Sequence, residues 1–423
     1  MQKKLGFTSI VLLGINSIIG SGVFFFPHIT SKEIGLGSLW TLLFIAIVVM
    51  SLAACFAEAA GIYSQNGGPY VYVRDAFGEF PGFVVGFSKL VVQIITWAST
   101  ACALKVALGA IWSPARTGTG GALIVVGTLV GLGIVNYLGV NFTKVLNNVV
   151  TVSKIIPILI FIVVGVFFVK GSHFELVMTD SAFKWSKFGA ISLMWFYAFQ
   201  GFESLAVASE DMENPKQNLP RAIMIVMTVI TIFYIGVHVL SIGVLGNDLK
   251  TETMPIQAAL YRMIGPTGLM IACTGTLISI AGINIANSFI TPRCMVALAE
   301  DKLLPSCFAK ESRFGTPGFA IVASTIIAIP VALSGSYQML VTLAVVSGFI
   351  QYISTAMAVI RLRSTKKDVV RPFQLPFGVL IPACSIVAST WLLLQAPPLE
   401  LVAGLAGLFL AVPFYLAMKY QQS

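Results

Sequence analysis

The residues best suited to ligand chemistry lie where apolar stretches of the chain are interrupted by glycine. The first interruption holds Gly20, Ser21 and Gly22, and glycine adopts backbone angles that other residues resist. Past such a break, the amides of these three residues could donate to an anion such as a carboxylate, helped by the dipole of the half-helix that follows. The carbonyl groups just before it, at Ile18 and Ile19, are acceptors suited to an ammonium. The alternative is that these small residues only allow close helix packing.

A second apolar stretch breaks in a comparable place, at Phe199, Gln200 and Gly201. The glycine permits the break, and the aromatic rings of Tyr197, Phe199 or Phe202 could close over a ligand as a thin gate. Gln200 could tune selectivity through its side chain, or face a neighbouring helix. Lipid offers no partner for freed backbone groups, so breaks at membrane depth persist where the backbone lines a cavity. Two such breaks in corresponding halves of a chain predict the substrate site of a solute carrier.

Charged side chains inside the apolar stretches are a further signal, because carboxylates within a membrane are usually functional. Apart from Glu400 at the very start of the last predicted span, Glu203 and Glu58 are the acidic residues in the predicted spans, and Glu203 could carry a proton or cap a half-helix. Lys154 lies about seven residues into its span, roughly 10 Å at 1.5 Å per residue. Its side chain either snorkels to the membrane surface or takes the place of a sodium ion that ties the first span to the eighth. Desolvation of an ammonium favours release of its proton, so proton exchange is possible there. Lys89 and Lys105 lie nearer the ends of their span and are predicted to snorkel.

Asn284 and Asn287 add polarity to the eighth predicted span. They could bind a substrate, replace a sodium ligand or pair with other helices. The three histidines are dispersed and form no nucleophile–base or metal motif, and the six cysteines include no CxxC pair. A channel would show a selectivity-filter repeat or rings of charge, and neither is present. We therefore expect a protein that is not an enzyme and has no metal site and no cofactor.

Composition places these residues in an all-α integral membrane protein. The chain is 57% hydrophobic and 10% charged, whereas soluble domains carry about 25% charged residues. Most basic residues outside the apolar stretches lie on the side of the N-terminus, which predicts that both termini are cytoplasmic and the protein sits in the inner cell membrane. The net charge of +9 then reflects membrane orientation and not a nucleic-acid partner. A span of about 20 residues predicts twelve transmembrane helices, at 7–30, 38–63, 81–109, 121–139, 147–169, 188–209, 221–245, 266–292, 318–334, 338–361, 377–396 and 399–418.

The two predicted breaks fall in the first and the sixth span. A repeat of five spans inverts its second copy, which gives a pseudo-two-fold axis in the membrane plane. The chain then divides into a first inverted repeat at 1–170, a second at 171–363, and two appended helices at 364–423. This 5+5 division rests on break position and span count, because the two halves share no strong residue identity.

Four motifs in order along the chain resemble the amino acid–polyamine–organocation (APC) superfamily, and its bacterial L-amino-acid transporters in particular. They are GSGVFFFP at 20–27, AEAAGIYSQNGGPYVYVRDAFGEFPGF at 57–83, FYAFQGFESLAVASEDMENPKQNLPRAI at 196–223 and SFITPRCMVALAEDKLLP at 288–305. The resemblance implies a leucine-transporter-like fold with broken helices 1 and 6. It also implies that the substrate carboxylate meets amides at Ser21 and Gly22, and the amine meets carbonyls near Ile18, Tyr197 and Gln200. An aromatic gate matches Phe199, with Tyr197 or Phe202 as alternatives.

Lys154 resembles the fifth-span lysine of sodium-independent members of this superfamily. That implies exchange or proton coupling without sodium. The third span holds no acidic residue between 81 and 109, which favours a neutral amino acid as substrate. Export of neutral amino acids, transport of cationic amino acids or polyamines, and sensing without transport are the alternatives. The expected partners are an amino acid, protons in a coupled mechanism, and the lipid bilayer.

Overall fold

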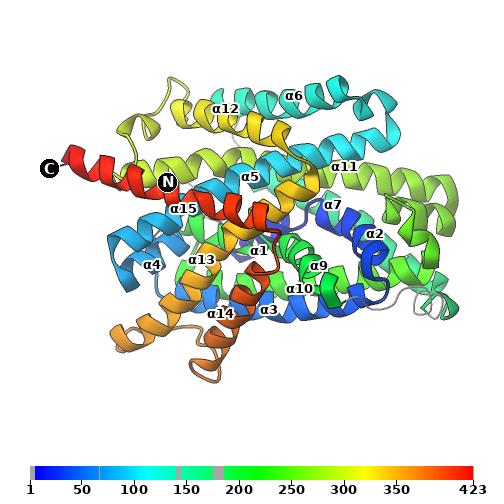
Figure 1. The fold of residues 1–423 in the computed structure, drawn as a ribbon, viewed down its shortest axis with the longest axis horizontal. Helices are drawn as coiled ribbons and strands as arrows, with labels where there is room; N and C mark the ends of the chain where they lie inside the picture. Colours follow the sequence, from blue (N-terminus) through cyan, green and yellow to red (C-terminus); the bar gives the residue numbers. More distant parts are fainter. Residues whose placement is uncertain (1–4, 66, 140–143, 175–184, 423) are drawn as a thin grey trace.

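The computed structural model describes residues 5–65, 67–139, 144–174 and 185–422, and these segments are almost entirely helical (Figure 1). Short turns and 3-10 segments join the helices. The helices are α1 (Phe7–Ile18), α2 (Gly22–Ile34), α3 (Gly37–Ala60), α4 (Pro69–Phe77), α5 (Glu79–Ile111), α6 (Gly118–Tyr137), α7 (Lys144–Gly165), α9 (Trp185–Phe199), α10 (Pro215–Leu245), α11 (Pro255–Glu300), α12 (Gly318–Ser334), α13 (Tyr337–Thr365), α14 (Leu380–Leu393) and α15 (Pro398–Gln422).

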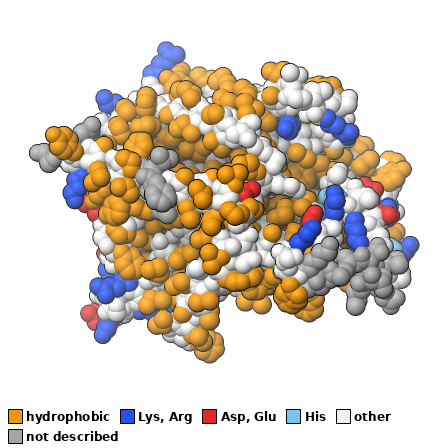
Figure 2. Space-filling model, viewed as in Figure 1, with side chains coloured by type: hydrophobic (Ala, Val, Ile, Leu, Met, Phe, Trp, Pro, Cys, Tyr) orange, Lys and Arg blue, Asp and Glu red, His pale blue; other side chains and the backbone are white. Residues whose placement is uncertain are grey.

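Many of these helices have the length and apolarity needed to cross a membrane. Within the described ranges, eight helical segments pass that test, and the pair α1 and α2, which meets at 40°, would make a ninth. α12 and α14 are shorter apolar helices. Each predicted span overlaps a helix, but the count of twelve membrane crossings and the inverted repeat stay predictions. Apolar side chains cover the middle of the face in Figure 2, and Lys and Arg gather toward its two ends, as expected for a protein surrounded by lipid.

Both helix breaks lie where the sequence predicts them. α1 ends at Ile18 and α2 begins at Gly22, while α9 ends at Phe199 and the 3-10 segment η3 (Phe202–Asp211) follows. Gly201 has a φ of 124°, a region that residues with a Cβ rarely adopt. A Cβ at this position would lie 2.3 Å from the carbonyl oxygen of Ser17. The two breaks therefore pack directly against each other.

Proline stands at the start of several helices. Pro69 begins α4, Pro215 begins α10 six residues before the predicted span, and Pro255 begins α11. Proline suits the first helical position because the amide it lacks has no partner within the helix there. α11 also contains a kink at Ile264 and Gly265, so a short helical segment precedes the predicted eighth span.

Tyr234 of α10 holds the two interruptions together. Its hydroxyl donates to the carbonyl oxygen of Ala198 at 2.8 Å and lies 3.4 Å from that of Ile18. Each of these carbonyls belongs to the last turn of a helix that stops at a break, where carbonyl groups lack partners within the helix. α5 packs against both α11 and α13 and completes the wall around the breaks.

Candidate functional site

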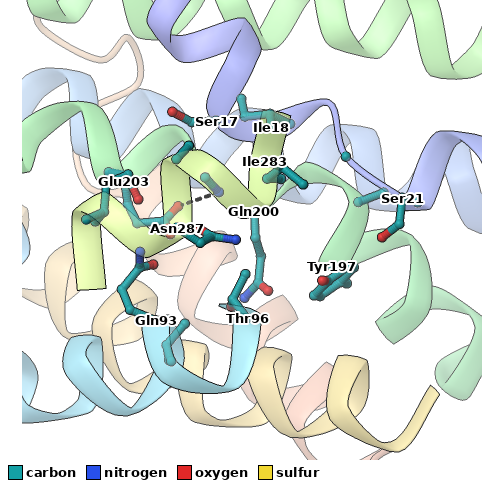
Figure 3. Close-up of a pocket in the computed structure, with 18 residues that line it drawn as sticks. Ser17, Ile18, Ser21, Gln93, Thr96, Tyr197, Gln200, Glu203, Ile283 and Asn287 are labelled. Atoms are coloured by element: carbon teal, nitrogen blue, oxygen red, sulfur yellow. Dashed lines mark hydrogen bonds between the residues drawn. The ribbon is translucent and has the colours of Figure 1, made fainter. Parts of the chain in front are cut away.

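A small cavity of about 30 Å³ lies between the two interruptions (Figure 3). Four parts of the chain form it: the α1–α2 break, the α9–η3 break, and one face each of α5 and α11. A cavity of this size holds about one water molecule, so a larger ligand needs the surrounding side chains or helices to move. The lining residues are Ser17, Ile18, Gly20, Ser21, Gly22, Val92, Gln93, Thr96, Tyr197, Ala198, Gln200, Gly201, Glu203, Ser204, Ile283, Ala286, Asn287 and Ile290.

The first break brings three backbone amides to the cavity wall. The amides of Gly20, Ser21 and Gly22 donate to no protein atom in the described part of the chain. Close packing also requires Gly22, because a Cβ there would lie 2.9 Å from the Cβ and 3.2 Å from the Cα of Ala198. Packing and amide exposure therefore occur together at this break. The hydroxyl of Ser21 lies 2.7 Å from that of Tyr337 on α13.

Lys154 reaches the same break from α7 and does not line the cavity. Its ammonium donates to the carbonyl oxygen of Asn16 at 2.8 Å and to that of Ile19 at 2.6 Å. The side chain is fully buried. It therefore faces the protein interior instead of snorkelling. Its positive charge lies at the C-terminal end of α1, where the partial negative charge of the helix dipole favours a cation. Ile19 does not line the cavity and contributes this carbonyl instead.

Of the three aromatic residues considered as a gate, Tyr197 is the one that lines the cavity. Its hydroxyl lies 2.6 Å from that of Ser99, and its ring lies close to Phe26 and Tyr337. Phe199 lies elsewhere: its ring packs edge-on against Tyr234, with centroids 5.0 Å apart.

Phe202 also points away from the cavity. Its ring stacks on Tyr352, with centroids 5.7 Å apart. Tyr197 and Phe199 are two residues apart in a helix and therefore point to opposite sides, and the non-helical backbone at Gly201 turns Phe202 in a further direction.

Gln200 contributes an amide with unmet hydrogen-bonding capacity. Its side chain is buried and lines the cavity, and neither its oxygen nor its nitrogen has a partner among the described residues. The nitrogen lies close to Gly348, where a Cβ would approach it to 2.7 Å. A buried polar group without a partner is costly. The arrangement therefore suits a ligand that supplies the missing hydrogen bonds.

Glu203 and Lys89 form a buried ion pair at one end of the cavity. The Lys89 ammonium lies 3.0 Å from Oε1 of Glu203 and 3.0 Å from the Ser204 hydroxyl. The amide of Gly201 donates to Oε2 of Glu203 at 2.9 Å. The predicted snorkelling of Lys89 is wrong: its side chain is 6% exposed. Lys89 turns inward because Glu203 offers a partner on the facing segment.

The two asparagines of α11 have different positions. Asn287 lines the cavity, and its nitrogen lies 3.4 Å from the hydroxyl of Thr100. Asn284 lies behind it and bonds Thr100 through both ends of its amide, at 2.8 and 3.2 Å. Asn284 therefore ties α11 to α5 and does not contact the cavity.

Sequence reasoning missed the polar wall that α5 supplies. Gln93 and Thr96 both line the cavity, and they lie three residues apart, on one face of the helix. Uncharged polar residues at that spacing in an apolar span were the available signal. Tyr337 was also missed, because only the fold brings the start of α13 to Ser21.

This geometry agrees with the similarity of the chain to known proteins. Residues 5–415 match the model of a family described as amino acid permease. This chain belongs to the amino acid permease family. The resemblance to the APC superfamily is thereby confirmed, and the permease is a membrane protein of amino acid transport.

Individual relatives of the permease cover most of its length. It is 33% identical over 404 residues to an uncharacterized transporter of Mycobacterium tuberculosis, spanning 85% of this chain and 80% of that protein. It is 28% identical over 443 residues to the serine/threonine exchanger SteT of Bacillus subtilis, spanning 100% and 98%. It is 25% identical over 452 residues to the branched-chain amino acid permease BcaP of the same organism, spanning 100% and 94%.

Proposed function

We propose that this permease carries neutral L-amino acids across the inner cell membrane by alternating access, without sodium, as an exchanger or a proton-coupled carrier. The observation that carries the proposal is the contact of the Lys154 ammonium with the carbonyl oxygens of Asn16 and Ile19. A sodium ion at this place would need the same oxygen ligands. A covalently attached cation at the end of α1 makes a metal ion there unnecessary.

The two breaks supply complementary groups for an amino acid backbone. The amides of Ser21 and Gly22 would bind the substrate carboxylate at the N-terminal end of α2, where negative charge is stabilised. Carbonyl groups near Ile18, Tyr197 and Gln200 would receive the ammonium. In the structure the Ile18 oxygen is only weakly engaged, by Tyr234 at 3.4 Å, so it keeps capacity for a substrate. Gln200 and Asn287 would face the rest of the molecule.

A substrate with a neutral side chain is supported by the names of two relatives and by the residues that form the cavity wall. SteT is named for serine and threonine, and BcaP for branched-chain amino acids, all of which have neutral side chains. The cavity wall combines apolar residues such as Ile283 and Ile290 with uncharged polar ones such as Thr96.

Transport would proceed by movement of helices around the cavity. Spans 1, 2, 6 and 7, which correspond to α1 to α3 and α9 to α10, would rock against the rest of the protein. Tyr197, with the rings around it, would close over the bound substrate. Lys154 would hold α1 in one state and release it in the other. The twelve spans, the inverted repeats at 1–170 and 171–363 and the cytoplasmic termini are the frame in which this movement takes place.

The test uses purified permease in liposomes loaded with unlabelled amino acids, to which a labelled panel of neutral amino acids is added. Uptake is compared with and without sodium, and with and without a pH gradient. Uptake that needs internal amino acid and ignores sodium establishes an exchanger. Uptake into empty vesicles under a pH gradient alone establishes a proton symporter.

Failure of the proposal has a distinct outcome in the same experiment. Sodium-dependent uptake contradicts the role given to Lys154. Uptake restricted to cationic amino acids or polyamines contradicts the neutral substrate class. A folded protein that binds a neutral amino acid but moves none of it would be a sensor, and outward movement alone would make it an exporter.

A further inference from the structure

We infer that Lys89 sets the charge selectivity of the cavity: by neutralising Glu203, it reserves the site for side chains without net charge and excludes cationic amino acids. This inference rests on the proposed function, because it names the residue pair through which the same cavity selects its substrate.

Glu203 is part of the cavity wall, and both of its oxygen atoms are engaged. The Lys89 ammonium occupies Oε1 at 3.0 Å, and the Gly201 amide occupies Oε2 at 2.9 Å. Lys89 reaches Glu203 from α5, one turn before Gln93, which also lines the cavity. Both charged side chains are almost fully buried. Each oxygen therefore already accepts a hydrogen bond, and the Lys89 charge compensates the charge of the carboxylate, so a second cation would gain much less there than at an unpaired carboxylate.

No other charged side chain lines the cavity among the described residues. Glu203 and Lys89 together contribute a formal charge of zero. In a site of low dielectric, one uncompensated charge would dominate the attraction of ligands. Without Lys89 the carboxylate would attract a cationic side chain. With Lys89 in place, such a side chain finds the carboxylate occupied and meets a like charge next to it.

Lys154 cannot provide this neutralisation. Its ammonium is directed at Asn16 and Ile19, at the end of α1. The absence of an acidic residue from the third span is also insufficient to explain a neutral preference, since Glu203 brings a carboxylate to the cavity from η3. The compensating charge comes from Lys89 itself.

The test measures which amino acids compete with a labelled neutral substrate in proteoliposomes at about pH 8.5, where a carboxylate with an ordinary pKa is ionised. The proteins are the wild type, Lys89→Gln, Glu203→Gln, the double variant and Lys89→Arg. Lysine and arginine should compete at least about tenfold better with Lys89→Gln than with the wild type, because a like charge is removed and a carboxylate is released. Glu203→Gln should shift competition in the opposite direction, toward aspartate and glutamate.

The remaining variants separate charge from structure. The double variant restores a pair without net charge, so neutral amino acids should again be its best competitors. The same result is expected for Lys89→Arg, which keeps the positive charge. A purely structural role for the pair would lower transport in each variant without changing the order of competitors. If Lys89→Gln alone does not fold, the competition profiles of Glu203→Gln and the double variant still test the inference.

Two further results have separate meanings. If lysine competes with the wild type as well as neutral amino acids do, the inference is overturned, while amino acid transport by this permease stands. If the wild type takes up no amino acid at all in vesicles where it is folded, the proposed function fails and the inference fails with it.

Discussion

The ammonium nitrogen of Lys154 lies 2.6 Å from the carbonyl oxygen of Ile19, at the point where α1 ends. A second bond joins the same nitrogen to the carbonyl oxygen of Asn16. These contacts connect α7 to the end of a helix that borders the cavity. The stability of the first break therefore depends on one buried cation.

Lys154→Ala should remove most transport, because it deletes two hydrogen bonds from a charged donor, each contributing about 1.5–3 kcal/mol. We expect the uptake rate to fall at least about tenfold, the equivalent of 1.4 kcal/mol. Uptake in proteoliposomes checks this, with size-exclusion chromatography to confirm folding. Lys105→Ala is the matched control, since Lys105 is only partly buried and should tolerate the change. Normal uptake by Lys154→Ala would remove this residue from the mechanism.

Gly201→Ala should prevent the two breaks from packing together. The new Cβ would lie 2.3 Å from the Ser17 carbonyl oxygen, at a backbone φ of 124° that alanine resists. Strain of this kind costs about 1–3 kcal/mol before the clash is added. We expect a lower melting temperature in detergent and strongly reduced uptake.

The control for this substitution is Gly127→Ala in α6, where a Cβ would meet nothing within 4 Å. Alanine should be tolerated there, or slightly stabilise the helix. Equal effects of the two substitutions would show that the packing of the breaks is not what Gly201 provides.

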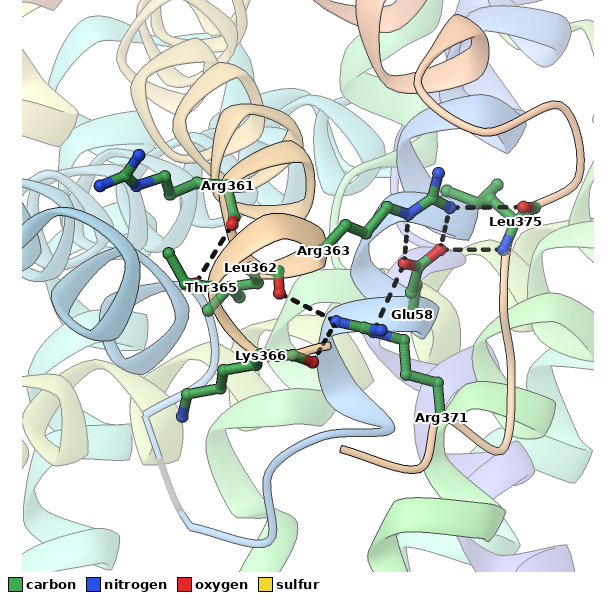
Figure 4. Close-up of polar contacts among 8 residues, drawn as sticks. All are labelled: Glu58, Arg361, Leu362, Arg363, Thr365, Lys366, Arg371 and Leu375. Atoms are coloured by element: carbon green, nitrogen blue, oxygen red, sulfur yellow. Dashed lines mark hydrogen bonds and ion pairs between the residues drawn. The ribbon is translucent and has the colours of Figure 1, made fainter. Parts of the chain in front are cut away.

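Glu58→Gln should destabilise the junction between α3 and the end of α13 (Figure 4). The Glu58 carboxylate accepts bonds from Arg363 at 2.5 and 2.7 Å and from the amide of Leu375 at 2.9 Å. Breaking a buried ion pair on one side costs about 3–5 kcal/mol, because the remaining charge is uncompensated. The melting temperature should fall by several degrees, as measured by thermal unfolding in detergent.

Two companion variants test whether the ion pair is responsible. Adding Arg363→Gln to Glu58→Gln should cost less than the sum of the single changes, because the Arg363 charge is removed together with its partner and only the more distant Arg371, 3.8 Å from Glu58, loses its carboxylate. Arg361→Gln is the control, since the Arg361 side chain is exposed and only its backbone carbonyl accepts hydrogen bonds among the described residues. Additive losses would contradict the pairing.

Asp75 should make stability depend on pH. Partial desolvation raises the pKa of Asp75, but hydrogen bonds from Lys366 and Tyr63, with the charges of Lys366 and Arg74, outweigh it and lower the pKa below its usual value. A carboxyl with a lowered folded pKa stabilises the protein above its unfolded pKa of about 4. That contribution is lost as the pH falls through the folded pKa.

The Asp75→Asn variant measures this contribution. Its melting temperature should lie below that of the wild type at neutral pH, and the gap should close as the pH falls below about 4. Thermal unfolding of both proteins across this range provides the comparison. A gap that does not depend on pH would assign the effect of Asp75 to packing instead of charge.

Much of the fold was predictable from the sequence, since apolar length and glycine placement act locally. The helix that stops at Ile18 and the one that stops at Phe199 end where the sequence predicts, because Gly20 and Gly201 permit backbone conformations that end a helix. The family was predictable as well, from motifs that stand in order along the chain. Several cavity residues, among them Ser21 and Gln200, could be proposed because they sit in the breaks themselves.

Only the tertiary structure decided which side chains meet. Lys89 and Lys154 are both lysines within apolar spans, yet one pairs with a carboxylate and the other with backbone carbonyls. Phe199 and Tyr197 are two residues apart, but only Tyr197 faces the cavity. The sequence by itself determined the membrane class, the helices and the position of the breaks, because these follow from hydrophobicity and backbone freedom along the chain. The buried charges and their partners are far apart in the sequence, 114 positions for Lys89 and Glu203 and 135 for Lys154 and Ile19, and only packing of the helices brings such groups within hydrogen-bond distance.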